Sequence, residues 1–119
     1  MTDLNHVRAL VADQLAMVRN PEIRLALQAV LVDPVPEQRI WDYGEPGERF
    51  TCWLIARSPT CRVGIAYCAQ GFGPRSPWGL VFIDDDAIGQ DAGWFPTLEE
   101  AFRDSWLWDE ANEGRADHL

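Results

Sequence analysis

The stretch FTCWLIARSPTCRVGIAYCA, residues 50–69, decides the fold class. Residues 50–57 are apolar on both faces of an extended chain, which predicts a central strand that is buried on both sides. Ser58, Pro59 and Thr60 form turns readily, and residues 61–69 follow with Val, Ile and Tyr at alternate positions. The stretch therefore predicts two antiparallel strands that are joined by a short connection.

Two further strands are predicted on either side of this pair. Residues 37–43, EQRIWDY, precede it after a break at 33–36, where two prolines interrupt the chain. Residues 79–83, GLVFI, follow a loop at 70–78 that is rich in Gly and Pro. The connections are short, so we expect a four-stranded antiparallel meander.

Helical patterns flank the predicted sheet. Apolar residues recur at three- and four-residue spacing over 3–19, which predicts a helix. Residues 21–32 fit both a helix and an alternating strand; Asn20 and Pro21, a cap and a first-turn residue, favour the helix, and a strand at its C-terminal end stays open. Thr97 and Glu100 form a capping box, so one last helix is predicted from Thr97 onward.

These elements predict a single α+β domain over residues 1–119. Its order is two N-terminal helices, a four-stranded antiparallel meander and one C-terminal helix. Residues 111–119 are expected to fray. The chain has no stretch that is long and apolar enough to span a membrane and no export signal at its N-terminus, so we expect a cytoplasmic protein.

The net charge of −9 is concentrated near the C-terminus. Residues 1–75 hold eight Arg and eight acidic residues, whereas residues 76–119 hold two Arg and eleven acidic residues. Phosphate and anionic lipid attract basic surfaces, so this balance argues against nucleic acid and membrane surfaces as partners. An acidic surface favours a basic protein partner, although acidic surfaces also simply aid solubility.

The sequence offers little for catalysis or for a cofactor. Lysine is absent, which removes every lysine-based mechanism, and the two histidines, His6 and His118, lie near the chain ends. The three cysteines, Cys52, Cys61 and Cys68, are nine and seven residues apart without partner histidines, which is not the spacing of a zinc site. We therefore predict a protein that is not an enzyme, with no catalytic residue, metal site or cofactor; a loose cation site at the aspartates of 84–86 stays open.

A partner-binding surface is the strongest functional hypothesis. We expect acidic side chains of the loop after the fourth strand and of the last helix to meet the partner, with a Trp and an exposed Leu as apolar anchors. The predicted residues are Asp84, Asp85, Asp86, Asp91, Trp94, Glu100, Asp104 and Leu107.

Two alternatives stay open. Aromatic residues at strand ends and in loops could line a pocket of an enzyme or of a small-ligand domain, and this pocket would hold Trp41, Tyr43, Phe72 and Trp78. A structural or assembly subunit is the second alternative, and it would need a symmetric apolar interface.

Four short motifs carry a resemblance: residues 41–44, 71–74, 77–79 and 94–102, which read WDYG, GFGP, PWG and WFPTLEEAF. Over residues 41–108 the chain resembles a group of small bacterial proteins that we associate with the immunity proteins of toxin–immunity pairs. The resemblance implies a cytoplasmic, non-catalytic protein that binds and inhibits a bacterial toxin. A basic toxin domain is then the expected partner, because an acidic inhibitor fits a basic cleft.

Overall fold

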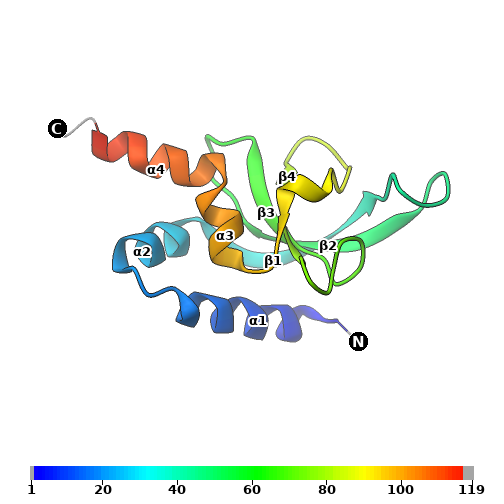
Figure 1. Cartoon of the computed structure of the whole chain (residues 1–119), viewed down its shortest axis with the longest axis horizontal. Coiled ribbons are helices and arrows are strands. Elements are labelled where there is room, and N and C mark those ends of the chain that lie inside the picture. Colours follow the sequence, from blue (N-terminus) through cyan, green and yellow to red (C-terminus); the bar gives the residue numbers. More distant parts are fainter. Residues whose placement is uncertain (1, 117–119) are drawn as a thin grey trace.

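A computed structural model of the chain describes residues 2–116 and has the expected α+β architecture (Figure 1). The strands form one antiparallel sheet in the order β1-β2-β3-β4-β5, so each strand pairs with the next along the chain. The meander is confirmed, with one strand more than expected. In chain order the elements are α1 (Leu4–Met17), α2 (Pro21–Val30), β1 (Leu31–Ile40), β2 (Arg49–Ala56), β3 (Val63–Tyr67), β4 (Trp78–Phe82), the 3-10 turn η1 (Asp91–Gly93), β5 (Trp94–Phe95), α3 (Leu98–Arg103) and α4 (Trp106–Ala116).

Both N-terminal helices begin at side-chain caps. Asp3 accepts a hydrogen bond from the amide of His6 at 2.8 Å, which starts α1. Asn20 accepts from the amide of Glu22 at 2.9 Å, and Pro21 occupies the first turn of α2. Because the cap and the proline act together, residues 21–30 are helical, as the sequence favours, and the chain becomes a strand at Leu31.

The first strand is longer than expected and begins earlier. β1 starts at Leu31, directly after α2, which agrees with the strand left open at the C-terminal end of 21–32, and the predicted break at 33–36 is wrong. The strand predicted over 37–43 is confirmed for 37–40, the last part of β1, whereas 41–43 lie in the connection to β2. Pro34 and Pro36 lie inside β1, whose pairing with β2 is irregular between Leu31 and Val35. β1 is an edge strand, and an edge strand tolerates proline because half of its amides need no partner in the sheet.

The C-terminal helix is broken into two. Thr97 accepts from the amide of Glu100 at 3.1 Å, so the cap predicted at Thr97 is confirmed. Glu100 reaches back, but its carboxylate accepts from the Thr97 hydroxyl at 3.0 Å, whereas in a capping box it accepts from the backbone amide of the cap residue. The single helix predicted after it is wrong, because α3 ends after one and a half turns. Ser105 is buried at the break: its hydroxyl donates to the carbonyl of Phe102 at 2.6 Å and accepts from the amide of Trp108 at 3.4 Å.

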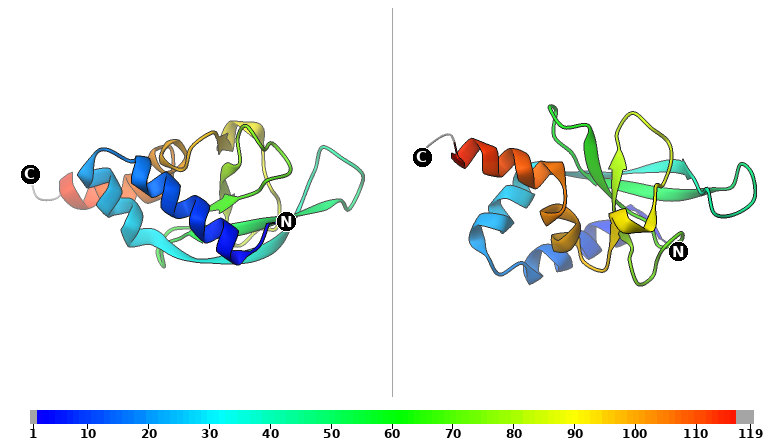
Figure 2. Two further views of the ribbon diagram at one scale, coloured as in Figure 1. Left: turned by 90° about the horizontal axis from the view of Figure 1, so that it is seen from below. Right: turned by 45° about the horizontal axis from the view of Figure 1, so that its top comes forward.

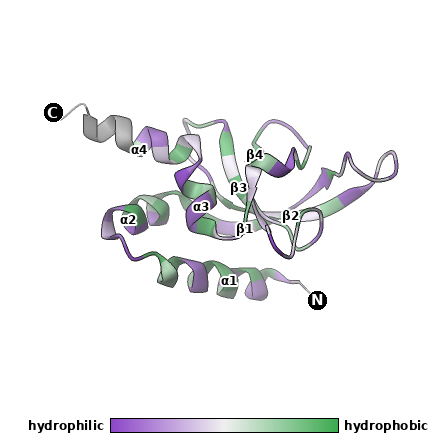
Figure 3. Ribbon diagram, in the orientation of Figure 1, coloured by the Kyte–Doolittle hydropathy of each residue, from purple (hydrophilic) through white to green (hydrophobic). Residues whose placement is uncertain are grey.

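Different parts of the chain cover the two faces of the sheet. Helices pack on one face, and Figure 2 shows α1 running alongside the strands while α2, α3 and α4 gather at one end. On the other face, Ile88 and Trp94 from the segment after β4 cover Cys52, Leu54 and Val81. Figure 3 shows the hydropathy of these segments: the central strand β3 is largely apolar, whereas the connection after β4 is largely hydrophilic. This second, smaller cluster positions the candidate site.

An exposed ion pair joins α1 to β1. Arg8 donates from Nε to one carboxylate oxygen of Asp33 and from Nη2 to the other, both at 2.7 Å. The hydrogen bonds from Arg8 lower the pKa of Asp33 below its usual value. At the opposite end of the chain α4 continues to Ala116, and residues 117–119, part of the segment expected to fray, lie outside the described residues.

Candidate functional site

The acidic loop, residues 83–91, is anchored to β1 through its backbone. The amide of Ile40 donates to the carbonyl of Asp86 at 2.7 Å, and the amide of Ile88 donates to the carbonyl of Ile40 at 3.0 Å. The side chain of Ile88 is buried, and its carbonyl accepts from the indole Nε1 of Trp94 at 3.1 Å. Bonds at both ends of its central segment therefore fix the loop against the sheet.

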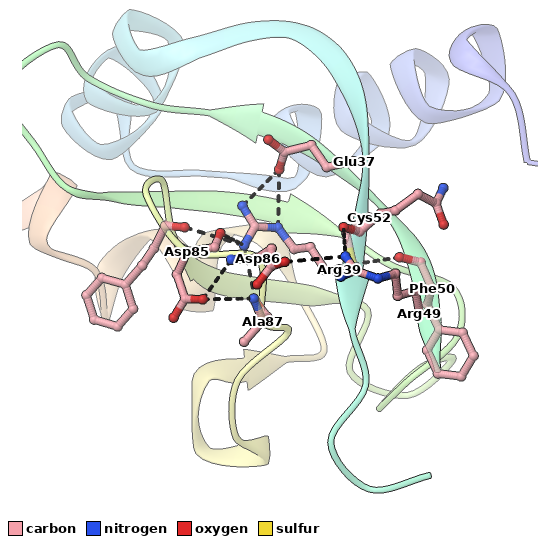
Figure 4. A network of polar contacts seen from close by, with 10 residues as sticks. Glu37, Arg39, Arg49, Phe50, Cys52, Asp85, Asp86 and Ala87 are labelled. Atoms are coloured by element: carbon pink, nitrogen blue, oxygen red, sulfur yellow. Dashed lines mark hydrogen bonds and ion pairs between the residues drawn. The ribbon is translucent and has the colours of Figure 1, made fainter. Parts of the chain in front are cut away.

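Arg39 of β1 holds the same loop from the inside (Figure 4). Its side chain is 2% exposed, and Nη1 donates to the carbonyl oxygens of Phe82 at 3.4 Å, Asp85 at 2.8 Å and Ala87 at 3.1 Å. Nε and Nη2 donate to one carboxylate oxygen of Glu37 at 3.2 and 2.9 Å. A guanidinium has five donors in a fixed plane, so a single side chain serves both the carboxylate and the loop.

Sequence reasoning missed Arg39, because an isolated Arg is rarely buried. One signal was present: Glu37 and Arg39 are two residues apart in a strand, so their side chains share a face and can pair. The sequence does not say that the acidic loop folds over that face.

The outer side of the acidic loop presents its carboxylates to solvent. Two of them form exposed ion pairs: Asp84 with Arg62, at 2.9 Å between Oδ2 and Nη2, and Asp86 with Arg49, at 3.4 Å between Oδ2 and Nη1. Such surface pairs contribute little to stability. A third carboxylate accepts from the amides of the next two residues, including Ala87 at 3.2 Å, and thereby shapes the turn. The exposed aspartates of the loop are Asp84, paired with Arg62; Asp85, which shapes the turn; Asp86, paired with Arg49; and Asp91.

The two predicted apolar anchors are buried, so the expectation that they are accessible is wrong. Trp94 is 5% exposed, because its indole lies over Gly79, where any Cβ would overlap the ring. Leu107 is 3% exposed, because the break at Ser105 restarts the helix and turns this side chain into the core. The same break turns Trp106 outward.

The exposed apolar residues beside the acidic loop are Phe82 and Trp106. Phe82 ends β4 and is 46% exposed, and Trp106 begins α4 and is 52% exposed. Their ring centroids are 5.9 Å apart at an interplanar angle of 69°. A cleft of about 180 Å³ lies between β4 and the start of α4, with Asp104 at its edge.

The structure brings some of the predicted acidic residues together and separates others. Phe82 lines both this cleft, to which Asp104 belongs, and a neighbouring cavity of about 460 Å³, to which Asp85 belongs. Asp86 points toward Arg49 on the β1–β2 side. Glu100 is exposed but accepts from the Thr97 hydroxyl at the start of α3. We name the surface over the acidic loop, Phe82, Asp104 and Trp106 the acidic face.

The predicted aromatic pocket does not form as one group. Trp41, Tyr43 and Phe72 pack against one another, with ring centroids 4.9 to 5.6 Å apart. Trp78 contacts Tyr67 instead, at 5.0 Å, within the cluster on the helical side of the sheet. The three rings stabilise the β1–β2 connection on the loop after β3.

Two of the three cysteines lie close together. All three are free and buried. In the register of β2 with β3, Trp53 faces Tyr67, which places Cys52 next to Cys68. A hydrogen bond between the two thiols, together with burial, raises the pKa of Cys52 above its ordinary value. The two thiols therefore lie directly opposite each other, in β2 and just after β3, whereas a hairpin without the irregularity between Leu54 and Ala56 would place them diagonally.

Among the side chains that the structure describes, those of residues 2–111, no three of the kind that bind metals are grouped so that they could hold an ion. His6 is exposed on α1, and His118 lies outside the described residues. No helix in this part of the chain has the length and apolar character needed to cross a membrane.

Comparison of the chain with models of protein families, with curated proteins and with solved structures finds no match.

Proposed function

We propose that the chain is a non-catalytic, cytoplasmic binding protein of the immunity type, which neutralises a bacterial toxin by covering a basic surface of that toxin with its acidic face. The observation that carries the proposal is the fixed outward presentation of carboxylates by the acidic loop. Backbone bonds to Ile40 and the buried Arg39 hold the loop, while its four aspartates stay exposed.

A rigid charged loop suits a binding role for a physical reason. Ordering a loop on association costs free energy, so a loop that is already held loses less when it binds. The exposed carboxylates of the loop would also steer a basic partner and speed its association. The exposed ion pairs from Arg49 and Arg62 can exchange for cations of the partner, since surface pairs of this kind are weak.

The proposal predicts that a neighbouring gene encodes a toxic domain, and the experiment uses that domain. Co-expression of this chain should restore growth, and the two purified proteins should bind in calorimetry. Changing the four loop aspartates to asparagine should slow association about tenfold or more at low salt and flatten its salt dependence. The four substitutions are Asp84→Asn, Asp85→Asn, Asp86→Asn and Asp91→Asn.

A matched control removes the same number of charges elsewhere on the surface. The control substitutions are Asp13→Asn, Glu22→Gln, Asp42→Asn and Glu45→Gln, at four exposed positions outside the acidic face. We expect the control to retain most of the association rate. Equal rates for the two variants would move the binding surface elsewhere, and failure of the wild-type chain to bind or to rescue growth would refute the proposed function.

A further inference from the structure

The cleft between β4 and α4 combines two exposed aromatic rings with a carboxylate. Phe82 and Trp106 form its open side, and Val63, Leu80 and Val81 line its apolar interior. Asp104 stands at its edge. A volume of about 180 Å³ corresponds to several water molecules, each with a share of about 30 Å³ in the liquid, and so accommodates one long side chain.

The charge at this cleft is negative after the neighbouring ion pairs are counted. Arg62 is paired with Asp84 at 2.9 Å, and Arg103 with Glu99 at 3.7 Å, so both nearby cations are matched by carboxylates. Among the described residues Asp104 makes no ion pair. An occupant of this cleft therefore needs an apolar stem and a cationic end.

Resting on the proposed function, we infer that the cleft receives an arginine side chain from the basic surface of the protein partner. The methylene stem of arginine would lie along Phe82 and Leu80, since such stems cover apolar surface while the charged end stays near water. The guanidinium would stack on the Trp106 indole and pair with the carboxylate of Asp104. Its planar, weakly hydrated cation suits both contacts, whereas a lysine ammonium offers only a point charge.

A short blocked peptide with one arginine between leucines is the probe, and NMR of the indole N–H of Trp106 is the measurement. The arginine peptide should shift this signal and those of residues lining the cleft. The same peptide with lysine should bind several-fold more weakly, and the peptide with citrulline, which is planar but uncharged, should bind more weakly than both. Equal binding of all three peptides would overturn the inference.

Two variants test the contacts. Trp106→Ala should weaken binding of the arginine peptide about three- to fivefold, the loss expected from one exposed cation–π contact. Asp104→Asn should weaken it about two- to fivefold, as for one exposed ion pair. Tyr43→Ala, at an equally exposed aromatic residue in the β1–β2 connection, is the matched control and should leave binding unchanged. In Trp106→Ala the titration follows the signals of the other residues that line the cleft, and an affinity equal to that of the wild type would refute the inference.

The toxin separates this inference from the proposed function. If the toxin binds and depends on the loop aspartates but not on Trp106 or Asp104, the cleft inference fails and the function stands. If the arginine peptide binds as described but the toxin does not bind, the function fails and the cleft inference stands. Light scattering tests whether a second copy of this chain occupies the cleft instead. A dimer that Trp106→Ala dissociates would assign the cleft to that second copy and overturn the inference.

Discussion

Replacing Arg39 by methionine removes the guanidinium and keeps a long side chain in its place. The carboxylate of Glu37 and three backbone carbonyls, those of Phe82, Asp85 and Ala87, then lose their donor. Removing one partner of a buried ion pair costs about 3–5 kcal/mol. Glu37 keeps 33% of its side chain exposed and can regain water, so we expect the lower end, about 3 kcal/mol, in the free energy of unfolding.

Urea unfolding and amide hydrogen exchange together measure this effect. Arg39→Met should lower the unfolding free energy by the stated amount and should speed exchange at the amides of Ile40 and Ile88, which bond across the loop junction. Arg57→Met is the control, because Arg57 is exposed, and a surface change of this kind shifts stability by less than about 0.5 kcal/mol. If the unfolding free energy of Arg39→Met stays within about 1 kcal/mol of the wild-type value, and both amides stay protected, Arg39 does not anchor the loop.

Two further predictions concern buried polar groups. Ser105→Ala removes the hydroxyl that bonds both sides of the α3–α4 break, and calorimetry should record a loss of about 1–2 kcal/mol, as for other helix caps; Ser58→Ala, in a connection at the surface, should cost less. The pKa of Cys52 is raised in the folded state, so its stabilisation is present below the unfolded pKa of about 8.5 and is lost as pH rises above it. Under reducing conditions the unfolding free energy should therefore fall by up to about 1.4 kcal/mol per pH unit above pH 9. Replacing both Cys52 and Cys68 by alanine should reduce that slope, and burial of Cys61 and Tyr67, which also raises their pKa values, accounts for the remainder.

Each of these two predictions has a result that would contradict it. An unchanged melting temperature for Ser105→Ala would mean that the break at this residue does not depend on its hydroxyl. A wild-type stability that stays level from pH 8 to 10 would mean that Cys52 ionises as easily in the folded chain as in the unfolded one.

The local signals in the sequence were sufficient for most of the fold. Caps at Asn20 and Thr97 marked helix starts correctly, and the apolar run over 50–57 marked a strand of the sheet interior. Prolines misled the prediction in 33–36, because their effect depends on whether a strand lies at an edge, and edge position is a property of the whole sheet.

The candidate site was less predictable than the fold. The loop aspartates are exposed, as acidic residues in a loop usually are. The exposure of Leu107 was predicted wrongly because the helix breaks at Ser105, which changes the helical phase between Phe102 and Trp106. Trp94 is buried for another reason, because its indole packs on Gly79. The role of Arg39 was not predicted because its hydrogen bonds to the loop go to backbone carbonyls more than forty residues away. Every residue has a backbone carbonyl, so the sequence does not indicate which ones an arginine will contact.

The two edges of the sheet restrict how this chain can be recognised. At one edge Pro34 and Pro36 lack the N–H groups that a neighbouring chain would need, and at the other edge β5 spans only two residues. Both features shorten the row of backbone donors and acceptors to which a foreign strand can be added, so they disfavour growth of the sheet through a partner's backbone. Under the proposed function, recognition would then depend mainly on side chains, so single substitutions in the partner would change its affinity and related partners could be distinguished.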